Sequence, residues 1–165
     1  MLFDMRQILL VIHILLGIIW VGGVLFVGWG VYPTVRKMNI PNQRAFLISL
    51  MNWTHKLFTL VGLAVIFTGI LLGTVFGPIK EWHYLLTTTY GHIFLTALII
   101  GFATLGWGSL VAHRYTMKVL GDQSIWNYAE KGSTTLLNHE MFKVTLVTSV
   151  EVIGFTALIY LIVLL

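Results

Sequence analysis

The sequence HILLGIIWVGGVLF at residues 13–26 and the sequence HIFLTALIIGFATLG at residues 92–106 each begin with a histidine and contain no charged residue. Further along, THKLF at 54–58 and NHEMF at 138–142 stand a similar distance apart, about 80 residues. Such a repeat of histidines in apolar surroundings is typical of a duplicated helical hairpin. We therefore predict two tandem hairpins, each of which contributes two histidines to the interior of a bundle.

Composition favours a membrane environment for this bundle. The chain has 165 residues, of which 58% are hydrophobic and only 10% charged. Four apolar stretches, roughly 8–32, 57–76, 90–112 and 144–165, are each about long enough to cross a hydrocarbon core of about 30 Å. We predict an all-α integral membrane protein with a single transmembrane domain, a four-helix up-down-up-down bundle.

The distribution of Lys and Arg predicts how the bundle is oriented. Eight of the ten basic residues lie in the segments between the first and second helices and between the third and fourth. The positive-inside rule places these segments in the cytoplasm and both termini outside, which we expect to be across the plasma membrane of a prokaryote. This bias accounts for the net charge of +4, so no nucleic-acid partner is predicted. Because the chain has no cysteine, iron–sulfur clusters and c-type haem attachment are excluded.

Two segments between the apolar stretches are predicted to lie along the cytoplasmic interface. Pro41–Leu47 has a proline near its start and reads as a short interfacial helix. Gln123–Leu137 is predicted to do the same, with Trp126 and Tyr128 at the level of the lipid headgroups.

Two histidines in the outer half of the bundle are the first candidate ligand pair. His13 and His92 each lie several residues inside an apolar helix, at matching depth, where polar side chains are costly and usually functional. The first and third helices of a four-helix bundle are diagonal neighbours, so both rings can reach the core. This arrangement suits ligation of one haem iron by two imidazoles.

A second pair, His55 and His139, begins the second and fourth helices and predicts another haem near the cytoplasmic surface. His113 lies at the same level, so two alternatives stay open. The three histidines together could bind copper or zinc. Otherwise His113 and Arg114 would contact haem propionates, a role also open to Arg36, Lys37 and Lys56.

Glu151 lies near the middle of the fourth apolar stretch, where an ionised carboxylate is unfavourable. One interpretation is a protonated acid that hydrogen-bonds Thr68 or Thr104 on a neighbouring helix. The other is a catalytic role, as a proton relay or a contact to quinone.

The first helix also resembles that of a known group of proteins. With His13, Trp20, Gly22-Gly23 and Phe26, followed by Tyr32-Pro33, it is similar over about 25 residues to small membrane proteins of the copper-resistance D type and to HemJ-type protoporphyrinogen oxidases. The resemblance implies a four-helix, haem-binding plan and supports His13 as a haem or metal ligand. HemJ-type proteins also use a lysine in the third helix, which this chain lacks, and no Met-rich or His-rich copper tract is present.

These observations together predict a b-type cytochrome with one or two haems b. We expect it to transfer electrons across or within the membrane, as an oxidoreductase if it is an enzyme. Its electron donor would be quinol from the quinone pool or a redox partner subunit, and the chain would be the membrane subunit of a larger respiratory complex. Two alternatives are a copper- or metal-handling membrane protein with a histidine site on the cytoplasmic side, and a structural subunit without a cofactor.

Overall fold

The predicted all-α class is confirmed. The structure is a computed structural model that describes residues 2–164, and no strand occurs in that range. Four helical stretches there are long and apolar enough to cross a membrane: Asp4–Val35, Ile40–Gly73, Thr89–Gly121 and Thr135–Val163. The elements are α1 (Leu2–Phe26), the π-helical segment η1 (Val27–Val31), α2 (Tyr32–Val35), α3 (Ile40–Gly73), α4 (Trp82–Thr87), α5 (Thr89–Gly106), the π-helical segment η2 (Trp107–Ala112), α6 (His113–Gly121), α7 (Gln123–Glu130) and α8 (Thr135–Val163). The last residue of the predicted fourth helix, Leu165, lies outside the described residues.

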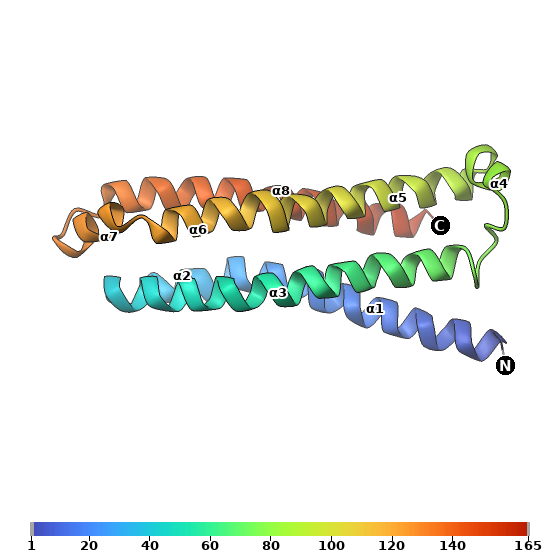
Figure 1. Ribbon diagram of the computed structural model, residues 1–165, viewed down its shortest axis with the longest axis horizontal. Helices are drawn as coiled ribbons and strands as arrows, with labels where there is room; N and C mark the ends of the chain where they lie inside the picture. The colour runs from blue at the N-terminus through green and yellow to red at the C-terminus, as the bar shows by residue number, and fades with distance from the viewer. Residues whose placement is uncertain (1, 165) are drawn as a thin grey trace.

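The four long stretches lie side by side, with the N-terminus, α4 and the C-terminus toward one end and α7 at the other (Figure 1). α1 packs against α3, α3 against α5, and α5 against α8. The Trp20 and Phe155 rings join α1 to α8 in an edge-to-face contact with centroids 5.1 Å apart. The α1–α2 and α5–α6 stretches are therefore diagonal to each other, as are α3 and α8.

The helices extend well beyond the apolar stretches at the end that carries α7. α3 begins at Ile40 rather than near residue 57, and α8 begins at Thr135 rather than near 144. Pro41–Leu47, predicted as a separate interfacial helix, instead forms the first turns of α3. The helix starts there because the Asn39 side chain accepts a hydrogen bond from the backbone N–H of Asn42 at 3.1 Å, with Pro41 in the first turn.

A hydrophobic core fills the α7 end and explains why the helices continue. It joins Val35, Leu47, Val119, Leu120, Ile125, Trp126, Ala129, Leu137, Met141 and Val144. The Trp126 side chain is fully buried, and its indole N–H donates to the carbonyl of Val119 at 3.2 Å. The prediction that Trp126 lies at headgroup level is thus wrong, whereas Tyr128 on the same short helix is exposed.

Two side chains, Arg44 and Asp122, form hydrogen bonds that stabilise the turn between α6 and α7. The Arg44 guanidinium donates to the carbonyls of Leu120 and Gly121 at 2.9 and 3.2 Å, at the C-terminus of α6. The Asp122 carboxylate accepts from the hydroxyl and the backbone N–H of Ser124 at 2.6 and 3.0 Å, at the N-terminus of α7. These hydrogen bonds from Ser124 lower the pKa of Asp122.

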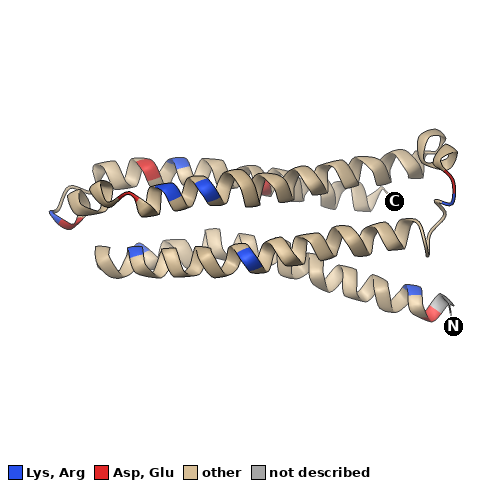
Figure 2. Cartoon of the chain, in the orientation of Figure 1, with Lys and Arg blue, Asp and Glu red and all other residues tan. Residues whose placement is uncertain are grey.

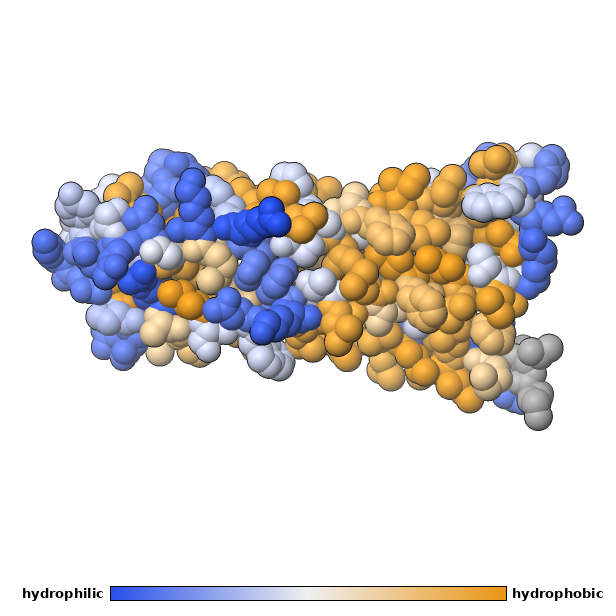
Figure 3. Space-filling model, in the orientation of Figure 1, coloured by the Kyte–Doolittle hydropathy of each residue, from blue (hydrophilic) through white to orange (hydrophobic). Residues whose placement is uncertain are grey.

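The surface divides into two halves along the bundle. On the face that Figure 3 shows, apolar side chains dominate the half near the N-terminus and polar side chains dominate the half near α7, where Trp53 and Phe142 are nevertheless exposed. Charged residues gather mainly in the α7 half and at the α4 end (Figure 2). The 34 residues of α3 span about 51 Å at 1.5 Å per residue, more than a hydrocarbon core of about 30 Å. α3 is therefore longer than a membrane crossing requires.

A second core of five buried side chains lies between these two halves. Trp20, Val61, Ile66, Leu105 and Phe155 come from all four long stretches. Gly62 allows this close approach, because a Cβ atom there would lie 2.7 Å from the Leu105 side chain and 3.0 Å from the Trp20 ring.

Candidate functional site

The two π-helical segments share a sequence motif that the sequence analysis missed. Gly28-Trp29-Gly30 lies in η1, and Gly106-Trp107-Gly108 runs from the end of α5 into η2. An arginine, Arg36 or Arg114, follows six residues after the last glycine of each motif. π-Helical turns inside α-helices occur often at functional sites. The motif is also a sharper mark of the repeat than the histidines are, because its two copies agree in both sequence and local structure.

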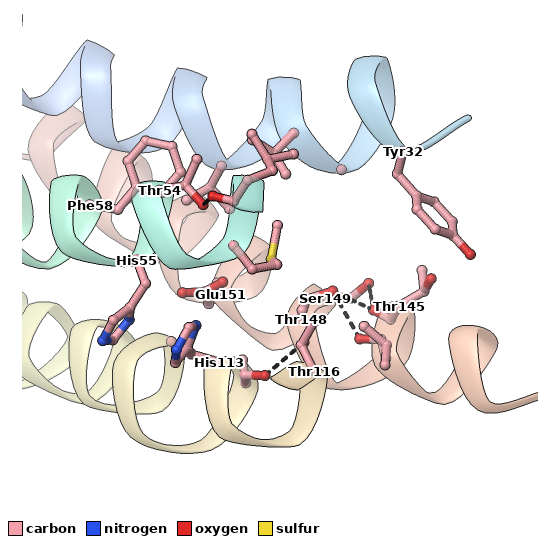
Figure 4. Close-up of a pocket in the computed structure, with 18 of the residues that line it drawn as sticks. Tyr32, Thr54, His55, Phe58, His113, Thr116, Thr145, Thr148, Ser149 and Glu151 are labelled. Atoms are coloured by element: carbon pink, nitrogen blue, oxygen red, sulfur yellow. Dashed lines mark hydrogen bonds between the residues drawn. The ribbon is translucent and has the colours of Figure 1, made fainter. Parts of the chain in front are cut away.

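Both π-helical segments line the same internal cavity, which has a volume of about 200 Å³ (Figure 4). The cavity lies on the α7 side of the Trp20–Phe155 contact, and its wall is largely apolar. His55 of α3, His113 at the start of α6 and Glu151 of α8 are the titratable side chains, besides Tyr32, that line it. Threonine and serine side chains, such as Thr116, complete the polar part of the wall.

His55 and His113 meet within this cavity. Their rings stack with centroids 3.8 Å apart and an interplanar angle of 12°. Figure 4 shows the two side chains reaching toward each other from α3 and from the start of α6. In the described part of the chain, neither ring has a hydrogen bond, so their ring nitrogens are available to a ligand or to water.

Glu151 faces Gly108 across the contact between α8 and η2. A Cβ atom at residue 108 would collide with the Glu151 carboxyl group, so the glycine makes room for it. The indole N–H of Trp107 donates to the carbonyl of Val147 at 2.9 Å and holds η2 against α8 at this level. Among residues 2–164, no side chain or backbone group hydrogen-bonds the Glu151 carboxyl.

The threonines that were predicted as partners of Glu151 have other contacts. The Thr68 hydroxyl lies 2.8 Å from Nδ1 of His13, and Thr104 packs where a side chain on Gly154 would lie. The structure therefore places Glu151 at a cavity wall rather than in a hydrogen bond to either threonine.

His13 is held against α3 in the outer half of the bundle. The Thr68 hydroxyl lies 2.8 Å from Nδ1 of His13 and also reaches the carbonyls of Ala64 and Val65 at 2.8 and 3.0 Å. When the hydroxyl donates to one of these carbonyls, Nδ1 carries the proton of a neutral His13 and the lone pair is on Nε2, the state in which an imidazole binds a metal. Gly69 makes room for the ring, which would lie 3.2 Å from a Cβ atom at that position.

The other predicted ligands lie elsewhere. His92 is exposed, and its Nε2 donates to the carbonyl of Leu86 at 2.8 Å. The His139 side chain is 62% exposed, with Nδ1 3.5 Å from the Glu140 carboxylate. The structure thus brings His55 together with His113 and leaves His13, His92 and His139 each with a different partner.

The predicted three-histidine metal site is not formed. Across residues 2–164, no three His, Asp or Glu side chains lie close enough together to hold a metal ion. Arg114 is exposed, next in sequence to His113, and Arg36 donates to the Asn138 side chain at 3.3 Å. Neither arginine lines the cavity, and within residues 2–164 neither forms an ion pair with a carboxylate.

Comparisons of the chain with models of protein families, with curated proteins and with solved structures find no match. The class that the fold and the cavity define is a four-helix protein of membrane-spanning character with an internal site of two histidines and a glutamate. The resemblance of the first helix to the copper-resistance D and HemJ types stays a prediction that rests on its motif.

Proposed function

We propose that this protein is a b-type haem protein of the membrane that transfers electrons, with His55 and His113 as its main ligand pair. The contact between these two rings carries the proposal, since it joins imidazoles from two facing helices inside a cavity. Cofactor sites in helical bundles are built in this way, from side chains on facing helices. In this proposal the second ligand beside His55 is His113, whereas His139 was predicted from the sequence.

The donor atoms of these residues are of the kind that ligate a haem iron. Two imidazoles without protein hydrogen-bond partners can both supply a neutral nitrogen to iron. In the stacked arrangement the rings occupy the space between the helices, so they must part to admit a macrocycle. Space is available beside η1, because a Cβ atom on Gly28 would meet no atom within 4 Å. Arg114, adjacent to His113, would pair with a propionate.

A bound haem would supply one-electron transfer, and the chain would supply its position and surroundings. The apolar wall of the cavity would exclude water, and Glu151 would hold a proton near the site. His13, through Nε2, would ligate an outer haem. His92 would be its second ligand if the His92 ring gave up its hydrogen bond to the Leu86 carbonyl. The electron donor would be quinol or a redox partner subunit.

We also propose how the bundle lies in the membrane. The four helices would cross in alternating directions, with α7 and the basic segments in the cytoplasm and the termini outside. The apolar half of the surface supports this arrangement, and the prokaryotic plasma membrane is the location it would suit (Figure 3).

A pyridine haemochrome assay on purified protein tests the haem proposal. We expect b-type haem in the wild-type protein, and a loss of at least half of it in His55→Ala and in His113→Ala. His83→Ala and His139→Ala are matched controls on exposed histidines and should keep the wild-type content. His13→Ala and His92→Ala test the outer site. A colourless wild-type protein that also takes up no added haem would overturn the proposal, as would full haem content in both His55→Ala and His113→Ala.

A further inference from the structure

We propose that a lipid-soluble quinone enters the cavity sideways from the membrane, between η1 and α8, and binds with its headgroup at Glu151. This inference deepens the proposed function, on which it rests for the redox role of the quinone. The binding site itself follows from the geometry of the groove and the cavity.

A groove on the outside of the bundle adjoins the cavity. One wall is Trp29 of η1, and the other is one face of α8 that includes Ile153, Thr156 and Tyr160. Ser149 and Val152, like Trp29, line both the groove and the cavity, so these three side chains form the boundary that the two spaces share. α1 and α8 touch through the Trp20 and Phe155 rings, on the far side of this opening from α7.

The groove faces the part of the surface that would meet lipid. Trp29 is 73% exposed and Ile153 is 69% exposed, both large apolar side chains. From Ser149 to Tyr160 the groove follows α8 for about 16 Å at 1.5 Å per residue. A channel with these properties fits an extended apolar tail and admits molecules dissolved in the bilayer rather than in water.

The inner end of the groove offers hydrogen bonds to a headgroup. The Glu151 carboxyl is partly buried, has no hydrogen-bond partner among the described residues and lines the cavity that the groove adjoins. The hydroxyl of Ser149 donates to the carbonyl of Thr145 at 2.7 Å, so its lone pairs remain to accept a further hydrogen bond. Both side chains are accessible, so each can hydrogen-bond a ligand or water in this space.

A quinone combines the two kinds of contact that this site requires. Its flat ring suits an apolar wall that includes Trp20 and Phe58, and its two carbonyl oxygens accept hydrogen bonds. A protonated Glu151 would donate to the quinone, and an ionised Glu151 would accept from a quinol hydroxyl. A phospholipid acyl chain could fill the groove but would leave the carboxyl without a partner, so we commit to the quinone.

Binding of decylubiquinone to the protein in lipid nanodiscs tests the site directly, by equilibrium dialysis and by photolabelling with an azido derivative. Wild-type protein should bind it saturably, with label on Trp29 or on α8 between Ser149 and Tyr160. Ile153→Trp should narrow the groove and weaken binding at least tenfold. Ile159→Trp is the matched control, because Ile159 is also exposed on α8 but does not line the groove.

Glu151→Leu should weaken decylubiquinone binding about tenfold, the effect of one lost hydrogen bond of about 1.4 kcal/mol. Glu151→Gln, which keeps a hydrogen-bond donor, should lose less. Absence of saturable binding would overturn the inference. Equal binding in the wild type, Ile153→Trp and Glu151→Leu would also overturn it, and would indicate that the groove binds only lipid acyl chains. Haem content measured on the same samples separates the two proposals. Haem without quinone binding would overturn only the quinone site, and quinone binding without haem would overturn only the haem assignment.

Discussion

At the scale of single residues, the site depends on which polar side chains have partners. The Thr68 hydroxyl contacts His13 and the Leu86 carbonyl accepts from His92, whereas His55 and His113 stack on each other and have no hydrogen bond among the described residues. A histidine that is fixed through one ring nitrogen presents the other nitrogen in a defined direction. The contact to Thr68 therefore matters both for stability and for any ligand that His13 binds.

Thr68→Val tests this contact at nearly constant volume. Loss of the hydroxyl removes the hydrogen bond between α1 and α3, so we expect the free energy of unfolding to fall by about 0.5–1.5 kcal/mol. The measurement is a titration with sodium dodecyl sulfate in mixed micelles, followed by circular dichroism. Thr96→Val is the control, because the Thr96 hydroxyl bonds only the carbonyl of His92 in its own helix. Equal effects of the two changes would show that the contact to His13 contributes nothing.

At the scale of helices, the π-helical turns decide where later side chains point. Each residue of an α-helix turns by about 100°, so one extra residue in a turn rotates everything after it by about that angle. η2 ends immediately before His113, whose ring then meets His55. When the two Gly-Trp-Gly motifs are aligned, Val35 corresponds to His113; it lies four residues after the end of η1 and is buried in the core near α7. The repeat is thus closest in its helical turns and departs from symmetry at the histidine.

Trp126→Ala tests whether α7 is a packed element or an interfacial one. The side chain is fully buried and donates a hydrogen bond, so its removal should lower the free energy of unfolding of the α7 end by about 3–5 kcal/mol. Limited proteolysis at Lys131, after α7, measures how often this end opens. Tyr128→Ala should change the cleavage rate little, because Tyr128 is exposed on the same helix. Similar cleavage of both variants would contradict the packed core.

At the scale of the whole molecule, the face shown in Figure 3 is mostly apolar in the half near the N-terminus and more polar in the half near α7. The cavity lies toward the polar half, on the α7 side of the Trp20–Phe155 contact, so its site would lie near one membrane surface. A ligand there could exchange protons with the adjacent aqueous phase and still be reached from the bilayer.

The orientation of the bundle can be tested with single cysteines, because the natural chain has none. Glu81→Cys lies before α4 and Ser133→Cys lies between α7 and α8; both positions are exposed. In intact cells, a maleimide that cannot cross membranes should label residue 81, and it should label residue 133 only after the membrane is opened. The reverse pattern would mean that the basic segments face outward.

Hydropathy and residue spacing were sufficient to predict four long apolar helices, because both are local properties of the chain. The histidines and Glu151 could likewise be selected from sequence alone, since polar groups in apolar stretches are few. The start of α3 and the burial of Trp126 could not be predicted, because side chains from distant segments make that core. The pairing of His55 with His113 rather than His139 was also decided by the tertiary structure. It depends on the rotation of each helix about its axis, which the π-helical turn at η2 changes and which hydropathy does not record.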